Sequence, residues 1–309
     1  MVKGADKPLV RPAQYAASIH GETGLDGVDL LPKVLASNLA SVPQSISAIA
    51  EHILAEPVNT VWIIATGPLT NIALLLRDFP AVRTHIKGLS IMGGAIGDVP
   101  TTSHTINGTK AATEPFAPAP PHRQDGKGNW TPHAEFNIWC DPEAAALVFA
   151  VLTPLNVPII LIPLDLTHQV RATAEVEQLL FPDPTDPSTN KSIVRPMFKQ
   201  ILLYFASTYS SVSGIHDGPP LHDPLAVFAV LEPDAFDDRG DERWRVNVDT
   251  SNGERAGETT AVPLGTDTNG DAIREEGVRI PRSVHLGRFW DAVDNALRAA
   301  EDATKNTMT

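Results

Sequence analysis

The chain has 309 residues, of which 42% are hydrophobic, and a formal net charge of -13. This length suits one large α/β domain or two ordinary ones. The acidic balance argues against nucleic acid or an anionic membrane as a partner, because phosphate binding needs clustered Lys and Arg, and it is compatible with a neutral small substrate. The single cysteine, Cys140, excludes an intrachain disulfide and favours a reducing, cytoplasmic compartment.

Short apolar runs alternate with helical patterns in the first half of the chain. We expect helices over 44–55, 67–80 and 141–152, and strands over 61–65, 88–94 and 157–166. Asp141 as N-cap and Pro142 at the first helical position mark the start of the third helix. This alternation indicates an α/β fold, with a mainly parallel sheet flanked by helices. Ligands of such sheets bind outside the carboxyl ends of the strands.

Three polar segments interrupt the pattern. Residues 97–134 form an unusually long connection, which is typical of a functional or disordered loop. Residues 182–191 are a short connector, and 250–277 are expected to form a hairpin with a long tip. An edge strand over 277–281 and an amphipathic helix over 287–301 then close the chain. Because no linker is evident, we expect a single domain over 1–309, with flexible inserts at 97–134 and 250–277.

The stretch "GPPLHDPLAVF" (218–228) allows two interpretations. Pro224 suits the first position of a helix, and Asp223 before it is a favoured N-cap. Leu225, Val227, Phe228 and Leu231 would then pack in the core. Alternatively, His222 and Asp223 are a proton donor and a metal ligand on one turn. The local pattern by itself favours the N-cap.

Several catalytic and metal-binding motifs are missing from the sequence. The residues that remain as candidates for a ligand site are rich in oxygen donors and amides. The sequence has no P-loop, no G-x-S-x-G elbow and no zinc pattern, and Cys140 is expected to be a buried filler. The segment "NWTPHAEFNIWCDPEAA" (129–145) offers Asn129, Glu135 and Asn137, which suit the hydroxyls of a sugar. Taken by themselves, these residues are better explained as a polar loop leading into a helix. His20 lies in a glycine-rich acidic loop, "SIHGETGLDGVDL" (18–30), whose spacing does not fit an EF-hand.

Eight ordered blocks together resemble the inosine-uridine preferring nucleoside hydrolase family. They are "GADKPLVR", "IHGETGLDG", "ATGPLTNIALLLRDFP", "LSIMGGA", "AEFNIWCDPEAAALVF", "IPLDLTHQV", "HDPLAVF" and "FWDAVDNALR", and they run from residue 4 to about 301. The resemblance implies hydrolysis of the N-glycosidic bond of ribonucleosides such as uridine or inosine, to base plus ribose. It also implies a Ca²⁺ that holds the ribose diol and a water, and a homo-oligomer, either a dimer or a tetramer.

The resemblance implies a role for each matching residue. Asp223 would give Ca²⁺ a carboxylate, and Thr66 a backbone carbonyl. His222 would protonate the departing base, a task that suits an imidazole. The groups expected to hold the ribose or to lie beside the substrate are Asn129, Glu135, Asn137, the backbone at Met92, Phe136, and His20 on a loop over the pocket. The 97–134 segment would form a lid or flap.

One family feature is not found in this sequence. The family begins with a strand that ends in Asp-x-Asp-x-x-x-Asp-Asp, which supplies most metal carboxylates and the base that activates water. We therefore expect a nucleoside hydrolase-like fold that lacks its N-terminal strand or strands. An incomplete chain of this kind would be impaired as a catalyst, because Ca²⁺ normally takes six to eight oxygens. The alternative is a non-catalytic family member that binds ribose, a nucleoside or a partner chain.

Overall fold

The computed structural model describes residues 2–31, 46–97, 105–106, 109–110, 127–182, 192–239, 241–264 and 277–307. The chain forms two compact units. The sheet unit consists of Met1–Gln14, Ser37–Gln169 and His222–Val284, and the helical unit of Tyr15–Ala36, Val170–Leu221 and His285–Thr309. Most of the expected lid at 97–134, the connector at 182–191 and the hairpin tip at 265–276 lie outside the described residues.

The sheet unit is built on six strands in the order β1-β2-β5-β9-β7-β8. Four of them run parallel, and the last two form an antiparallel hairpin beside β9. The sheet is therefore mainly parallel, as expected. The strands are β1 (Trp62–Ala65), β2 (Gly88–Met92), β5 (Ile159–Ile162), β9 (Val278–Arg279), β7 (Trp244–Val248) and β8 (Thr259–Pro263).

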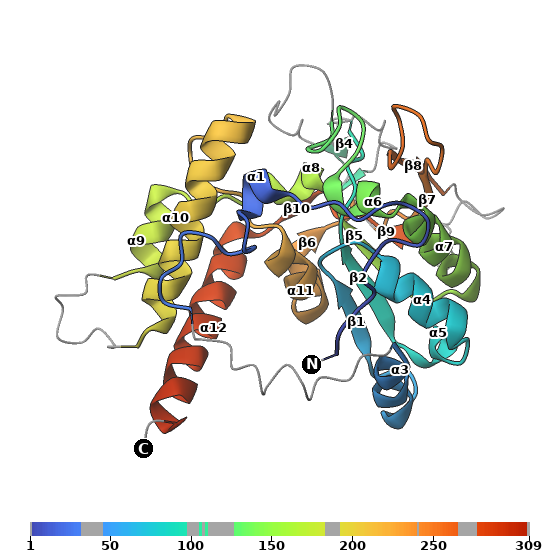
Figure 1. Ribbon diagram of the computed structural model, residues 1–309, viewed down its shortest axis with the longest axis horizontal. Helices are drawn as coiled ribbons and strands as arrows, with labels where there is room; N and C mark the ends of the chain where they lie inside the picture. The colour runs from blue at the N-terminus through green and yellow to red at the C-terminus, as the bar shows by residue number, and fades with distance from the viewer. Residues whose placement is uncertain are drawn as a thin grey trace. The chain divides into compact units, whose positions relative to one another are not determined.

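Helices cover both faces of this sheet. Side chains alternate between the faces of a strand, so Ser90 and Ile91 of β2 point to opposite sides. Ile91 belongs to a core cluster with α7 (Pro142–Leu152), whereas the Ser90 hydroxyl donates to the carbonyl of Ala226 in α11 (Asp223–Leu231) at 2.7 Å. Figure 1 shows α4 (Thr70–Asp78), α5 (Val82–His85) and α7 on one side of β1 and β2, and α11 on the other. The expected helix 44–55 is α3 (Ile46–Ala55), which packs on α4 and α5.

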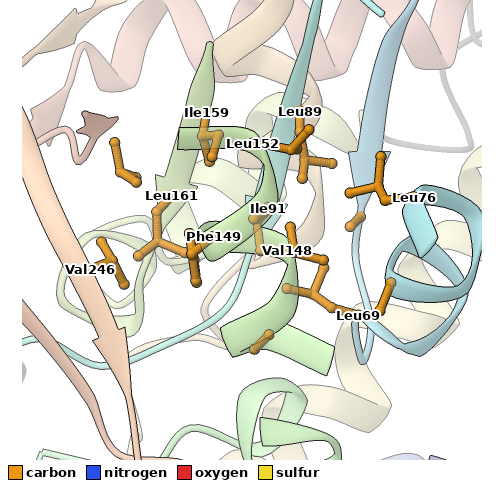
Figure 2. Close-up of a cluster of buried hydrophobic side chains, with 14 of the residues drawn as sticks. Leu69, Leu76, Leu89, Ile91, Val148, Phe149, Leu152, Ile159, Leu161 and Val246 are labelled. Atoms are coloured by element: carbon orange, nitrogen blue, oxygen red, sulfur yellow. The ribbon is translucent and has the colours of Figure 1, made fainter. Parts of the chain in front are cut away.

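The main core lies between α7 and the parallel strands. Leu89, Ile91, Val148, Leu152 and Leu161 are fully buried there. Each such side chain contributes about 1.5–3 kcal/mol when it leaves water. Figure 2 shows the α7 side chains directed at those of β2 and β5, with Leu69 and Leu76 beside them. This packing fixes the carboxyl ends of β1, β2 and β5 relative to one another.

The start of α7 confirms the expected N-cap. Oδ1 of the buried Asp141 accepts a hydrogen bond from the Ala144 amide at 3.1 Å. Oδ2 accepts from the Leu9 amide at 2.8 Å and from the Thr70 hydroxyl at 2.6 Å. One side chain therefore joins α7, α4 and the N-terminal segment.

The helical unit contains α1 (Ala17–His20), α9 (Ala174–Leu180), α10 (Val194–Ser213) and α12 (Leu286–Thr307). The guanidinium of Arg195 in α10 pairs with Asp294 at 2.8 Å and with Glu301 at 3.1 Å, both in α12. Phe289 and Leu297 of α12 are buried, as expected for the closing amphipathic helix. Within the described residues, no helix combines the length and apolarity needed to cross a membrane.

Three strand predictions are wrong in part. β9 is not an edge strand, because it pairs with β5 on one side and β7 on the other. The strand expected over 157–166 ends at Ile162, before Pro163, and a helical turn, α8 (Leu164–Thr167), follows. The hairpin partner of β8 is β7, which lies outside the expected 250–277 segment.

The remaining short elements are β3 (Thr105–Ile106), β4 (Thr109–Lys110), α6 (Phe136–Cys140), η1 (Thr153–Leu155), η2 (Pro233–Ala235), β6 (Phe236–Asp237) and β10 (Ser283–Val284).

The beginning of α11 also differs from the expectation. Asp223 is the first helical residue, and His222 occupies the cap position without a side-chain cap hydrogen bond. The side chain of Asp223 is therefore not the N-cap that the Asp-Pro pattern predicted. Leu225 and Phe228 are buried as expected, but Val227 is 39% exposed and Leu231 is 69% exposed.

Candidate active site

Most of the predicted site residues lie near the carboxyl ends of the parallel strands. Thr66 follows β1, Met92 ends β2, and α8 follows β5 after Pro163. Helix α11 packs against β1, β2 and β5 and begins with Asp223. This is the edge of the sheet at which the α/β architecture predicts a ligand site.

Glu135 is a buried carboxylate of this site whose position is fixed by backbone hydrogen bonds. It is 2% exposed and accepts backbone hydrogen bonds from Asn137 at 2.8 Å, Gly94 at 2.9 Å and Ile138 at 3.0 Å. Burial raises the pKa of Glu135 against the effect of these hydrogen bonds, and the nearby charge of Asp223 raises it further. The two carboxyl groups are therefore close enough to interact, as the prediction of a shared site requires.

Two amide side chains hold the same segment in place, one by a contact with β2 and one by a contact within the segment. Nδ2 of Asn137 donates to the Met92 carbonyl at 3.2 Å and contacts the Met92 sulfur at 3.3 Å. Oδ1 of Asn129 accepts from the Phe136 amide at 2.9 Å. These contacts use one end of each amide, so the opposite ends, Oδ1 of Asn137 and Nδ2 of Asn129, have the polarity to meet sugar hydroxyls.

Aromatic rings cover one side of the Glu135 segment. The ring of Trp130 lies 4.8 Å from that of Phe136 and 5.3 Å from that of Trp139, measured between centroids. Trp130 was not among the predicted site residues, although its place beside Asn129 was a usable signal. The cluster gives Phe136 a fixed position, and a half-buried aromatic ring is a suitable surface for a sugar or a planar base.

Asp223 has an unusual environment for a carboxylate at a helix start. The residue keeps access to solvent, but surrounding protein desolvates the carboxyl group and raises its pKa to about 6. Thr66, the other predicted metal ligand, is exposed. The Asp223 carboxylate is therefore available to a ligand.

His222 contacts one side chain from α8 and the side chain of the residue that follows it. Its Nδ1 is 2.7 Å from the Thr167 hydroxyl, and its ring centroid is 5.4 Å from that of His168 in an edge-to-face arrangement. Thr167 is fully buried, and His168 is 1% exposed. The ring orientation of His222 is therefore set by two groups to which the sequence analysis gave no role.

A second buried carboxylate, Asp165, was also missed as a positioning group. It accepts the backbone N–H groups of Ile96 and Gly97, each at 2.8 Å, and burial raises its pKa. The loop after β2 is thus held between Asp165 and Glu135, which accepts from Gly94. Gly94 has φ +81°, which favours glycine. The sequence signal was an aspartate inside an otherwise apolar stretch.

The other residues singled out in the sequence are His20 and Cys140. His20 belongs to the helical unit, where its ring packs edge-on against Phe205 at 5.5 Å, so its role over the pocket stays a prediction. Cys140 is buried, and this burial raises its thiol pKa to about 12, which makes it a poor nucleophile. A cavity of about 720 Å³ lies at the other end of the strands, lined by Trp62, Ile159 and Arg279 among others, and contains none of the predicted site residues.

Known proteins resemble this chain in sequence and in fold. The family model described as "Inosine-uridine preferring nucleoside hydrolase" matches residues 1–291. The uridine nucleosidase of Saccharomyces cerevisiae is 30% identical over 307 residues, which is 97% of this chain and 78% of the yeast protein. The pyrimidine-specific ribonucleoside hydrolase RihA of Salmonella paratyphi C is 34% identical over 250 residues, 80% of this chain and 64% of the relative. The fold matches the purine-preferring ribonucleoside hydrolase of Gardnerella vaginalis with a TM-score of 0.70 at 21% identity, over 97% of this chain and 80% of that one.

Proposed function

Because the chain belongs to the inosine-uridine preferring nucleoside hydrolase family, we propose that it binds ribonucleosides at the carboxyl ends of β1, β2 and β5 and hydrolyses their N-glycosidic bond. The reaction consumes a nucleoside and a water and releases a free base and ribose. The observation that carries this proposal is the buried carboxylate of Glu135, held by three backbone N–H groups, beside Asn137, whose amide donates to the Met92 carbonyl at the end of β2.

The polar groups of the site suit a ribose. A sugar hydroxyl both donates and accepts, so a carboxylate and an amide together can satisfy it. Glu135 and Asn137, whose positions are fixed by backbone contacts, are proposed to hold the hydroxyls together with Asn129 and the backbone at Met92. Phe136 would lie beside the sugar or the base. Fixed contacts of this kind stabilise a ring that flattens toward an oxocarbenium ion.

His222 is proposed to assist departure of the base. When the C–N bond breaks, its electron pair goes to the base nitrogen, and a proton from the imidazole neutralises the leaving group. The water supplies a hydroxyl to the sugar carbon and loses a proton. The family residue that takes this proton belongs to the aspartate motif, which has no match in this sequence.

The described residues do not by themselves fit the Ca²⁺ that the resemblance implies. Asp223 and the carbonyl of Thr66 could supply at most three oxygens, whereas Ca²⁺ takes six to eight. Within the described part of the chain, no group of three or more His, Cys, Asp or Glu side chains is placed to hold a metal ion. We therefore assign no step of the reaction to a metal, and we propose that turnover by these 309 residues is slow.

The main alternative is a non-catalytic protein that binds a nucleoside or ribose through the same groups. Calorimetric titration of the purified chain with uridine, inosine and ribose, followed by chromatography for free base, separates the two. The proposal predicts saturable nucleoside binding and slow release of base, both weakened by Glu135→Gln. Binding without base release supports the alternative. No binding of any of the three ligands contradicts both.

We further propose that the two units make up one domain, that the chain forms a homo-oligomer, a dimer or a tetramer, and that it acts in the cytoplasm. The single buried cysteine is compatible with a reducing compartment. Light scattering coupled to size-exclusion chromatography tests the oligomeric state, and a fluorescent fusion tests the location.

A further inference from the structure

Lys127 lies at the base of the turn that carries Asn129, and its ammonium group makes three contacts. Nζ donates to the Thr259 carbonyl at 2.9 Å and to the Ile96 carbonyl at 3.2 Å, and it lies 3.4 Å from a carboxylate oxygen of Glu258. An ammonium has three N–H donors, so these acceptors can use all of them. The side chain of Lys127 is 20% exposed. It is therefore bound within the sheet unit rather than extended into solvent.

The contact with Ile96 fixes the loop after β2. Both backbone polar groups of Ile96 are held, because Asp165 accepts its N–H at 2.8 Å and Lys127 donates to its carbonyl. Two residues earlier in the same loop, the Gly94 amide donates to the site carboxylate Glu135 at 2.9 Å. Lys127 and Glu135 thus hold the two ends of one short loop.

A compact turn follows Lys127 in the sequence and links it to Asn129. A Cβ added to Gly128 would lie 2.2 Å from the Thr131 carbonyl oxygen and 2.5 Å from the Ala134 nitrogen. Only a glycine allows the backbone to close this tightly. Because the turn has no free space at this point, a displacement of Lys127 would move Asn129 with it.

We propose that Lys127 is a positioning residue of the nucleoside site, and that its ammonium group keeps Asn129 in place by joining the compact turn to the start of β8 and to the loop after β2. This inference rests on the proposed function, in which Asn129 holds a ribose hydroxyl. Lys127 itself does not touch the substrate, since its donors are directed at protein acceptors. A contact residue that is already in place lowers the cost of binding.

Hydrogen exchange followed by mass spectrometry tests this role without a ligand. Lys127→Met keeps the length of the side chain but has no donor. Amides over 128–137 should exchange about tenfold faster in this variant than in the wild type, as expected for a local opening. Those of α7 should be unchanged, because the contacts of Lys127 are with other elements. Lys87→Met is the matched control, since Lys87 is exposed in the same unit, and it should change neither region.

Two results of this experiment overturn the proposal. One is unchanged exchange over 128–137 in Lys127→Met, and the other is an equal acceleration in α7, which would indicate a general loss of stability. If Lys127→Met does not fold, Lys127→Arg replaces it. That variant keeps the charge, but the planar fork of arginine does not match three acceptors placed around an ammonium. Wild-type exchange over 128–137 in Lys127→Arg would equally overturn the proposal.

A restored ammonium should restore the turn. Alkylation of Lys127→Cys with 2-bromoethylamine gives a side chain with the length and the terminal ammonium of lysine. Burial raises the pKa of the native Cys140 thiol to about 12, so it should not react, and intact mass should show one addition in the variant and none in the wild type. Alkylation should return the exchange over 128–137 to the wild-type rate. A confirmed single addition without this recovery contradicts a role of the ammonium.

Binding measurements connect the turn to the nucleoside site. In calorimetric titrations, Lys127→Met should raise the Kd for uridine about tenfold. In an Asn129→Ala background the same substitution should raise the Kd by less than about threefold, because the residue that Lys127 positions is gone. Equal losses in the two backgrounds contradict an action through Asn129. Absence of any binding by the wild type contradicts the proposed function, and the exchange result still decides whether Lys127 holds the turn.

Discussion

Glu135 combines a structural role with a proposed binding role in one side chain. Its two oxygens accept three backbone N–H groups, from the residues that start α6 and from the loop after β2. The same carboxylate is assigned to the ribose hydroxyls. A group that orders its own surroundings in this way keeps its geometry when a ligand arrives, which lowers the cost of binding.

Glu135→Gln should lower the free energy of unfolding by about 1–3 kcal/mol, because the amide nitrogen of Gln cannot accept a hydrogen bond and leaves a buried N–H unsatisfied. Urea denaturation measures the change. Glu51→Gln is the matched control, because Glu51 is exposed on α3 of the same unit, and it should change stability by less than about 0.5 kcal/mol. Equal effects of the two substitutions would contradict the assigned hydrogen bonds.

Asp223 should make stability depend on pH in a defined direction. Its pKa is raised to about 6 by desolvation, so the folded chain holds this proton more tightly than the unfolded chain, in which a carboxyl titrates near 3.9. The contribution of Asp223 to the free energy of unfolding is therefore most favourable at low pH and is lost as the pH rises through about 6. The side chain introduced by Asp223→Asn cannot ionise, so the variant does not lose stability in this way.

The Tm of Asp223→Asn minus that of the wild type should increase by roughly 2 °C from pH 4 to pH 7.5. The expected increase is modest because solvent reaches the side chain of Asp223. Thermal melts in EDTA measure it. Asp78→Asn is a control of opposite sign, since a hydrogen bond from Arg77 lowers the pKa of Asp78. A Tm difference between wild type and Asp223→Asn that does not vary with pH would rule out the perturbed carboxyl.

The sequence singled out the carboxylates and amides of the candidate site but not the groups that position them. Asn129, Glu135 and Asn137 lie within nine residues and share one local pattern. The contacts of Asp165 with Gly97 and of Thr167 with His222 span 68 and 55 residues. Partners this far apart leave no local signal, because only the folded sheet brings β2, β5 and α11 together.

At the scale of elements, helix α7 depends on its first turn. Asp141 caps it and also accepts from the Leu9 amide and the Thr70 hydroxyl, so its loss leaves three donors without their acceptor. Asp141→Ala should lower the free energy of unfolding by about 2–4 kcal/mol, which combines a lost cap with buried unsatisfied donors. Chemical denaturation tests this.

Thr70→Val provides the comparison for Asp141→Ala, because it removes one of the three donors and keeps the cap. Its cost should be clearly smaller, about 1 kcal/mol. If Asp141→Ala costs no more than Thr70→Val, the cap and the link to the N-terminal segment contribute little to stability.

The elements that could be predicted have strong local signals. β1, β2, β5, α4 and α7 combine apolar runs or helical spacing with capping residues or Pro. β9 has two residues, and its place between β5 and β7 depends on pairing with strands far away in the sequence. The Asp-Pro pattern predicted Asp223 as the cap because capping statistics ignore tertiary packing, and here the helix starts one residue earlier than that pattern implies.

At the scale of the whole molecule, a high content of acidic residues does not by itself make a metal site. The chain carries 37 Asp and Glu residues, yet within the described ranges no three of them, with or without His and Cys, are placed to hold an ion. The carboxylates at the sheet edge are instead Glu135 and Asp165, occupied by backbone N–H groups, and Asp223. We therefore expect the nucleoside site to bind its ligand better than it performs the chemistry.

The most direct test is the turnover of uridine and inosine by the purified 309-residue chain with millimolar Ca²⁺, beside the Saccharomyces cerevisiae uridine nucleosidase. His222→Ala gives the background from contaminating hydrolases. The account predicts release of base above that background but at least about 100-fold slower than the yeast enzyme, since a general base alone contributes about 10²–10⁴-fold. Turnover comparable to that of the yeast enzyme would contradict it.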